Sequence, residues 1–281
     1  MVFGLDVLAE LTRLAGATLI ATTVALGLID DQRRHPFALI LTGTLLLAAG
    51  CILVLIATVA PAARRLEEAL LPLALEYFQT TTHGPQLLTP ILPAIYGLLL
   101  AEGLRVVDAP GFRRALYIML AVTVVAILGL MAASGHVAIT EWDHVGMLLQ
   151  IVHMAAAVTW VAIVLALLPR LWTRQPLADD LARIGNFALA LVIILLFTGT
   201  GSAWLHDVEL PWPLDADYGK LLSLKTAALM LAVAAAGWNR FIELRAAVSH
   251  EGRIRSVLGI ETAVLLLALL LAAWLTRTPP P

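Results

Sequence analysis

Three histidines and three methionines of this chain lie close together in two neighbouring apolar stretches, and side chains of these types can bind a metal ion. His136 ends the first stretch, His144 opens the second, and His153 lies deeper within it. The same stretches contain three thioethers, those of Met131, Met147 and Met154. Imidazole and thioether together suit Cu(I), whereas Zn(II) normally takes more imidazole, thiolate or carboxylate at fixed spacing. The pattern favours a copper site, although a single methionine in an apolar stretch more often only fills the core.

The spacing of the histidines limits which of them could share one ion. His144 and His153 are nine residues apart, so on a straight helix they point to opposite sides. They could ligate one ion together only if His144 lay before the helix. The short connection of residues 137–143 returns the chain, so that His136 could approach either one. Haem b is the alternative to copper as the bound group. Its iron could take two membrane histidines as axial ligands, namely His153 together with His136 or with His83.

Four charged residues lie inside apolar stretches: Arg13, Glu102, Lys225 and Glu261. Each costs about 2.5–3.5 kcal/mol on membrane-insertion scales, so each is a candidate for function. Glu102 is one turn from Arg105, and we expect the two to form a pair at the membrane boundary. Arg13 follows Glu10 and Asp6 on the preceding turns, and we expect a locally neutralised cluster with a structural role.

Lys225 and Glu261 each lie some distance into an apolar stretch, and these two stretches begin on opposite sides of the membrane. Lys225 lies seven residues after Tyr218, which is about 10 Å along a helix, and Glu261 lies at a similar depth from the other side. In a hydrocarbon core about 30 Å thick, their long side chains are expected to approach each other near the middle. Such a pair could fix the packing of the helices or relay protons, and the sequence leaves both roles open.

The whole chain has the composition of a membrane protein. Of its 281 residues, 60% are hydrophobic and only 14% are charged, whereas about a quarter of the residues of a soluble domain are charged. The apolar runs are unbroken and rich in Leu and Ala, unlike the alternating segments of a membrane barrel. Residues 1–13 lack the pattern of a removable signal peptide. We therefore predict an all-α polytopic protein surrounded by the lipid bilayer.

Eight transmembrane helices are predicted from the apolar stretches between charges and turn residues. Their expected ranges are 6–29, 37–62, 86–107, 114–136, 144–169, 182–205, 218–240 and 254–275. A more polar segment near 64–85 lies between the second and third of these ranges. Its mixture of charged residues and leucines fits a short helix at the membrane surface.

The positive charges of the connections predict the orientation of the chain. Connections after the first, third, fifth and seventh helices carry twelve Lys and Arg residues, whereas the other side carries four. Because cytoplasmic loops are rich in Lys and Arg, both termini are expected on the periplasmic side of a bacterial inner membrane. The connections on that outer side are acidic and contain His83, His136 and His144. A cation that arrives from outside would meet possible ligands there.

A weak internal similarity divides the chain into two halves. Residues 83–88 resemble residues 218–222, and each segment opens the third helix of its half. We therefore expect a half of four helices at 1–136 and a second at 137–281, possible parallel repeats within one membrane domain. In transporters the interface between such halves often holds the binding site.

Several classes of protein are excluded by the same sequence. A net charge of -2 gives no basic surface for nucleic acid, and the single cysteine, Cys51, excludes an intramolecular disulfide. The chain has no P-loop, no His-Glu-x-x-His, no Gly-x-Ser-x-Gly and no Gly-x-Gly-x-x-Gly. We therefore expect no enzyme, apart from a redox role if haem is bound, and oligomerisation stays open.

An ordered series of residues in the second half is the most specific pattern of the sequence. It comprises Ser134-Gly135-His136, the segment from His153 to Trp160, Thr198-Gly199, Tyr218-Gly219 with Lys225, Asn239, and Glu261. Over residues 130–281 this series resembles the copper resistance protein D (CopD) family of bacterial inner-membrane proteins. The resemblance implies copper handling across that membrane, in concert with a periplasmic copper-binding partner.

Three hypotheses follow. The first is a copper permease that is not driven by ATP, in which the outer loops capture copper and His136, His153 and nearby methionines hold it. The second is a haem b electron carrier that uses the same histidines. The third is a delivery or assembly partner that loads copper into a cuproenzyme.

Overall fold

The computed structural model describes residues 2–29, 36–134, 143–173, 178–205, 217–238, 241 and 251–278. These residues form ten helices: α1 (Val2–Ile29), α2 (Pro36–Leu66), α3 (Leu70–Thr80), α4 (His83–Leu88), α5 (Ile91–Val106), α6 (Pro110–Ala133), α7 (Asp143–Thr173), α8 (Ala178–Leu205), α9 (Asp217–Trp238) and α10 (Glu251–Leu275). Within these ranges there is no strand. The predicted all-α fold class is confirmed.

Eight helical segments are long and apolar enough to cross a membrane, as predicted. Most boundaries agree with the sequence to within a few residues. One span, His83–Val106, consists of α4 and α5 with a break at Thr89 and Pro90. Pro90 and Pro93 have no amide hydrogen, so the regular hydrogen-bond ladder of the helix is interrupted there.

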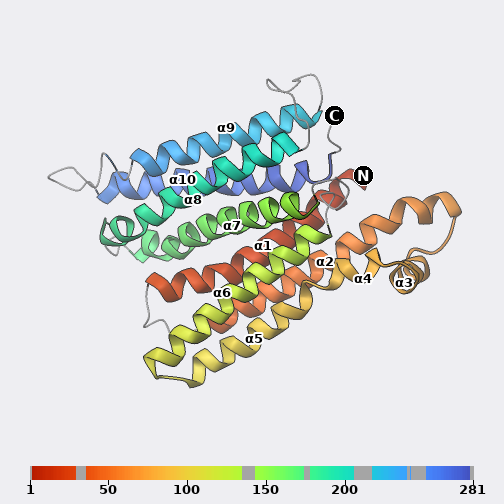
Figure 1. The fold of residues 1–281 in the computed structure, drawn as a ribbon, viewed down its shortest axis with the longest axis horizontal. Helices are drawn as coiled ribbons and strands as arrows, with labels where there is room; N and C mark the ends of the chain where they lie inside the picture. The colour runs from red at the N-terminus through yellow and green to blue at the C-terminus, as the bar shows by residue number, and fades with distance from the viewer. Residues whose placement is uncertain are drawn as a thin grey trace.

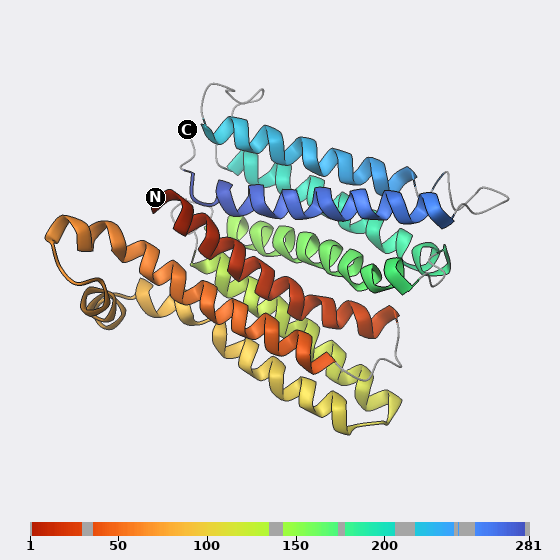
Figure 2. The ribbon, with the colours of Figure 1, turned by 180° about the vertical axis from the view of Figure 1, so that it is seen from behind.

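The spans form one elongated bundle in which α1 is central (Figure 1). Helix α1 packs against α2, α6, α7 and α10. Helices α7, α8, α9 and α10 lie on one side of the bundle, and α1, α2, α5 and α6 on the other (Figures 1 and 2). The two groups meet where α7 contacts α1 and α6, and where α10 contacts α1. This arrangement places the predicted halves side by side, whereas their relation as repeats stays a prediction.

The seam between α1 and α2 depends on glycines. A Cβ atom added at Gly16 would lie 2.6 Å from the carbonyl oxygen of Gly43, and one added at Gly43 would lie 2.8 Å from the carbonyl oxygen of Gly16. The two backbones are therefore nearly in contact. Small residues at helix crossings are the usual means by which membrane helices approach this closely.

The segment predicted at the membrane surface forms α3, although α2 first continues to Leu66. Glu67 adopts a positive φ of 55°, and the Glu68 amide donates to the Ala63 carbonyl at 3.0 Å. Together these features end α2 in a left-handed turn. Helix α3 then runs across the bundle axis at one end, where it is seen end-on (Figure 1). This direction is the one expected for a helix that lies in the plane of a membrane surface.

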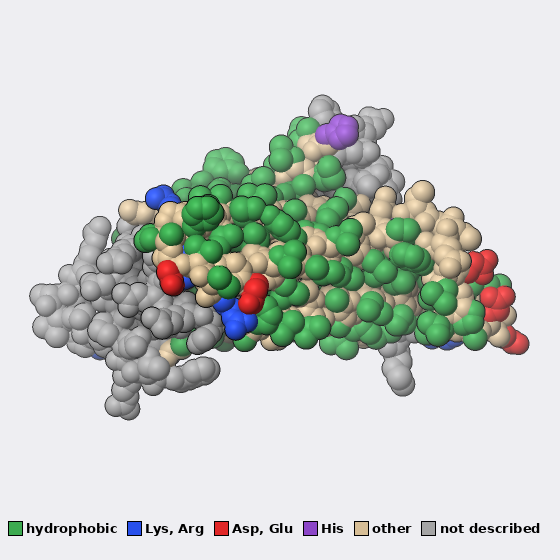
Figure 3. Space-filling model, turned by 90° about the horizontal axis from the view of Figure 1, so that it is seen from below, with side chains coloured by type: hydrophobic (Ala, Val, Ile, Leu, Met, Phe, Trp, Pro, Cys, Tyr) green, Lys and Arg blue, Asp and Glu red, His purple; other side chains and the backbone are tan. Residues whose placement is uncertain are grey.

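The outer surface of the bundle is apolar. Figure 3 shows a face that is mostly hydrophobic, with charged side chains toward its ends. Large exposed side chains include Phe197, Trp204 and Leu231 on α8 and α9. Such continuous apolar surface is what a lipid bilayer covers, so the protein is a multi-pass membrane protein.

Candidate functional site

The first functional side chain is the imidazole of His153 on α7. Its Nδ1 atom lies 2.9 Å from the hydroxyl oxygen of Thr198 on α8. The ring also lies against Gly199, where an added Cβ would be 3.5 Å from Cε1 of His153. The absence of a side chain at Gly199 therefore makes room for the imidazole between α7 and α8.

The hydrogen bonds of Thr198 determine how the His153 ring is protonated. The Thr198 hydroxyl donates to the Ile194 carbonyl at 2.7 Å, so its single proton is already in use. Its oxygen can then only accept from His153, which places the imidazole proton on Nδ1. In the neutral ring the lone pair of Nε2 is left available to a metal ion. A His ligand whose other nitrogen donates to a neighbour is the usual arrangement at metal sites.

Lys225 on α9 is the charged neighbour of His153. Its ammonium group is near enough to act electrostatically on the imidazole. Among the residues that the structure describes, Lys225 forms no ion pair with a carboxylate. In its protonated form Lys225 would repel a cation at Nε2 of His153, which sets the direction of one test below.

A second polar pair lies deeper in the same half. The indole N–H of Trp160 on α7 donates to Oε1 of Glu261 on α10 at 2.9 Å. Both side chains are buried, with exposed fractions of 1% and 4%. The predicted approach of Lys225 to Glu261 gives no ion pair in the described part of the chain; Glu261 is held by Trp160 instead.

Helix α7 aligns the two polar pairs. His153 and Trp160 are seven residues apart, which is close to two full helical turns, so they lie on the same face of α7 about 10 Å apart along its axis. Helix α7 thus makes two polar contacts with its neighbours. His153 contacts Thr198 on α8, and Trp160 contacts Glu261 on α10.

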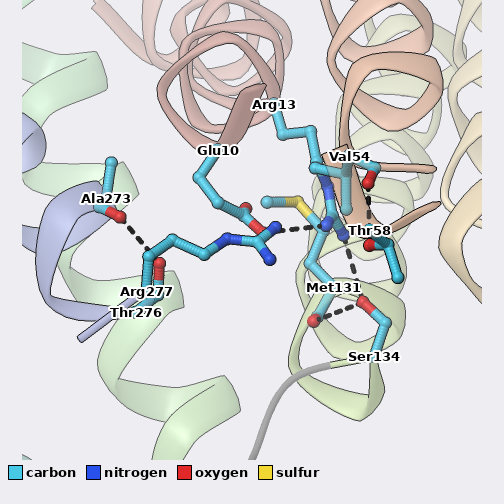
Figure 4. A network of polar contacts seen from close by, with 9 residues as sticks. All are labelled: Glu10, Arg13, Val54, Thr58, Met131, Ser134, Ala273, Thr276 and Arg277. Atoms are coloured by element: carbon cyan, nitrogen blue, oxygen red, sulfur yellow. Dashed lines mark hydrogen bonds and ion pairs between the residues drawn. The ribbon is translucent and has the colours of Figure 1, made fainter. Parts of the chain in front are cut away.

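A third cluster closes the end of the bundle at which the two termini lie, and Figure 4 shows it in detail. Glu10 accepts from Arg13 at 3.2 Å and from Arg277 at 2.7 Å. Arg13 also donates to the hydroxyl of Ser134 at 3.1 Å, and that hydroxyl donates to the Met131 carbonyl at 2.9 Å. The cluster joins α1, the end of α6 and the residues after α10.

The predicted pairing of Arg13 with Glu10 is confirmed, whereas Arg13 and Asp6 form no ion pair among the described residues. Arg13 is only 2% exposed, and a Cβ at Gly50 would lie 2.7 Å from its Cγ. Three buried polar atoms of the region have no hydrogen-bond partner among the described residues: Oδ1 of Asp6 and the Nε atoms of Arg13 and Arg277. The predicted boundary pair is also confirmed, since Arg105 donates to Glu102 at 2.9 Å with both side chains about half exposed.

The other predicted ligands are placed apart or lie outside the described residues. His83 begins α4 and His144 is exposed at the start of α7, whereas His153 is turned toward α8. Met131 is buried beside the Arg13 cluster, and Met147 and Met154 are half-buried on α7. His136 and Asn239 fall outside the described residues, so the pairing of His136 with His153 stays a prediction.

No group of three or more His, Cys, Asp or Glu side chains that could hold a metal ion occurs among the described residues. His153 is therefore the one predicted ligand for which the structure shows a supporting hydrogen bond within that part of the chain. Tyr218 and Gly219 begin α9, with Gly219 buried.

Three functional contacts were missed by reasoning from the sequence. Thr198 appears in the series without a role, and its hydroxyl supports His153. Trp160 appears there too, and its indole binds Glu261. Arg277 is not singled out by the sequence, and no spacing could have paired it with Glu10, which is 267 residues away.

Comparison with known proteins gives one match. The family model described as copper resistance protein D matches residues 178–275, which confirms the predicted resemblance over this segment. It contains α8, α9 and α10, and hence Thr198, Lys225 and Glu261. No curated protein and no solved structure matches the chain.

Proposed function

We propose that this protein, whose residues 178–275 match the copper resistance protein D family, captures copper at the periplasmic end of its bundle, holds it at His153 within the membrane, and carries it inward or passes it on. The family match supports a role in copper resistance or handling. The finer proposal places the protein in a bacterial inner membrane with both termini in the periplasm. It takes copper from a periplasmic copper-binding protein and acts without catalysing a reaction.

The observation that carries this proposal is the hydrogen bond from His153 to Thr198. It fixes the imidazole so that Nε2 is free to bind a soft metal ion, and imidazole is a good copper ligand. His153 lies ten residues into α7, which is about 15 Å along the helix. Copper bound there would be well inside the membrane, beyond the reach of a surface loop.

The route to His153 is proposed to use the outer histidines and the boundary between the two halves. His83, His136 and His144 supply successive imidazoles on the side where we place the periplasm. Met147 and Met154 lie on α7 on either side of His153 along the chain. The halves, residues 1–136 and 137–281, meet at α7, which is also the helix that carries His153.

The test is a comparison of bound copper in purified proteins. The full-length protein in detergent is exposed to Cu(I), freed of excess metal, and analysed for copper. We expect the wild type to retain copper in stoichiometric amount and His153→Ala to lose it. His35→Ala is the matched control, because the charge pattern places His35 on the opposite side of the membrane. Equal copper in wild type and His153→Ala would refute the proposal.

Two further measurements distinguish a copper permease from a haem b protein and from a copper-delivery partner, all of which would use His153. A Soret band in the visible spectrum of the protein as isolated, lost in His153→Ala, would make His153 a haem b ligand and overturn the copper proposal. Copper uptake into sealed vesicles that contain the protein would identify a permease. Copper binding without uptake, together with a cuproenzyme that co-purifies, would identify a delivery partner.

A further inference from the structure

Glu261 lies at the middle of the membrane-spanning part of α10. It is ten residues after Glu251 and fourteen before Leu275, so it is about 15 Å and about 21 Å from the two ends of the helix. Its side chain is only 4% exposed. An ionised carboxylate at this depth costs several kcal/mol unless a cation or several donors stabilise it.

Within the described part of the chain, Glu261 has a single hydrogen-bond donor. The Trp160 indole binds Oε1, and no Lys or Arg among the described residues forms an ion pair with Glu261. Glu10, which is 15% exposed, is bound differently, because it accepts from two guanidinium groups. One neutral donor suits a neutral acid, whose carbonyl oxygen accepts while its hydroxyl keeps the proton.

No charged group on the helices packed against α10 compensates Glu261. These helices are α1, α7 and α9. Their described titratable and charged side chains are Asp6, Glu10 and Arg13 on α1, His144 and His153 on α7, and Asp217, Tyr218, Lys220 and Lys225 on α9. Arg13 is bound to Glu10, and Lys220 to Asp217. Lys225 acts on His153, and its ammonium has no ion pair with Glu261 in the described part.

We propose that Glu261, held by Trp160, is an exchangeable proton-binding site in the middle of the membrane. A glutamine would accept the same hydrogen bond from Trp160 and pack in nearly the same volume, but it would carry no exchangeable proton. The proton-binding role therefore makes a prediction that a purely structural role does not.

The position of Glu261 relative to His153 suggests that release of its proton is coupled to copper movement. Trp160 lies on the same face of α7 as His153, about 10 Å deeper. When Glu261–COOH releases its proton to water, the carboxylate that remains is a negative charge within the membrane. A Cu(I) ion that advances from His153 offsets that charge. One proton leaves as one copper ion advances, so the charge inside the bundle stays constant. This coupling step rests on the proposed function, whereas the proton site itself does not.

The proton is detected by infrared spectroscopy of the full-length protein without copper. A protonated carboxylic acid absorbs as a carbonyl stretch, distinct from the two stretches of a carboxylate. In the difference spectrum between wild type and Glu261→Gln at neutral pH, we expect the acid band in the wild type and its loss in the variant. Glu102→Gln is the matched control, because Glu102 is exposed and paired with Arg105, and it should remove carboxylate bands instead.

A second pair of variants tests the geometry. Trp160→Phe removes the indole donor, and the acid band should move to higher frequency because hydrogen bonding weakens the C=O bond. Trp204→Phe, at a side chain that is 75% exposed, should leave the band in place. Carboxylate bands from Glu261 in the wild type, or an acid band unaffected by Glu261→Gln, would overturn the proton site.

The coupling is tested in vesicles that contain a pH-sensitive dye. We expect Cu(I) addition to produce proton movement with the wild type. We expect Glu261→Gln to abolish this movement while the detergent-solubilised variant still binds copper. Proton movement that persists in Glu261→Gln would overturn the coupling. If the wild type binds no copper, the proposed function fails, and the infrared result still decides the proton site.

Discussion

Replacement of Thr198 by valine tests whether the hydrogen bond to His153 prepares it for copper. Valine has the same branched shape as threonine and the same rotamer restriction in a helix, so the packing between α7 and α8 is kept. What is lost is the acceptor oxygen 2.9 Å from Nδ1 of His153. The ring then loses the partner that fixes its tautomer, and packing against Gly199 has to hold its orientation without this hydrogen bond.

The expected magnitude follows from two effects. A neutral hydrogen bond contributes about 0.5–1.5 kcal/mol net, which corresponds to roughly twofold to tenfold in Kd. Loss of the fixed ring orientation adds to this, and removal of such supporting groups at metal sites typically weakens binding by about 10–100-fold. We expect a Kd for Cu(I) that rises about tenfold.

The assay is competition for Cu(I) between the purified protein and a chromophoric chelator of known affinity. Thr198→Ser is the matched variant, because serine keeps the hydroxyl and can make the same two hydrogen bonds. We expect Thr198→Ser to bind nearly as the wild type does. If Thr198→Val binds copper as tightly as both, the hydrogen bond does not prepare His153, and our reasoning from the tautomer is refuted.

Two more predictions concern charge and packing. Lys225→Met removes the positive neighbour of His153 and should tighten Cu(I) binding by roughly tenfold, since a nearby unit charge contributes on the order of 1–4 kcal/mol. The same chelator competition measures the Kd, and Lys220→Met, at an exposed position, serves as the control. Weaker Cu(I) binding by Lys225→Met would contradict the placement of copper at His153. Gly43→Val puts a side chain into the seam between α1 and α2, where a Cβ meets the Gly16 carbonyl oxygen at 2.8 Å. We expect it to lower the stability of the protein by about 1–3 kcal/mol, which the midpoint of thermal aggregation measures. Gly237→Val, at a position with open space around it, should change this midpoint little.

The local features of this fold could be predicted from the sequence. Unbroken apolar stretches define the eight spans because the bilayer sets their length. The pairs Glu10–Arg13 and Glu102–Arg105 were predicted correctly, because residues three apart share a helix face whatever the rest of the chain does. These contacts need no knowledge of how helices are rotated.

The contacts that build the site could not be predicted in this way. The contacts His153–Thr198 and Trp160–Glu261 join residues on different helices that are 45 and 101 positions apart in sequence. Depth in the membrane suggested that Lys225 would approach Glu261, but depth does not determine which face of each helix a residue occupies. The rotation of α10 turns Glu261 toward Trp160 instead, and rotation is decided by packing against α1, α7 and α9.

The position of α1 at the centre of the bundle affects the order in which the molecule can be assembled. Helix α1 is synthesised before α10, which is one of its neighbours in the bundle. At about 5–20 residues per second, the 267 residues between Glu10 and Arg277 take roughly 13–53 s to emerge. During that time Glu10 already neutralises Arg13 within the same helix, so α1 carries its own counter-ion into the membrane. Arg277 completes the cluster only after α10 has been synthesised, and a chain truncated before α10 would leave one face of α1 without its partner.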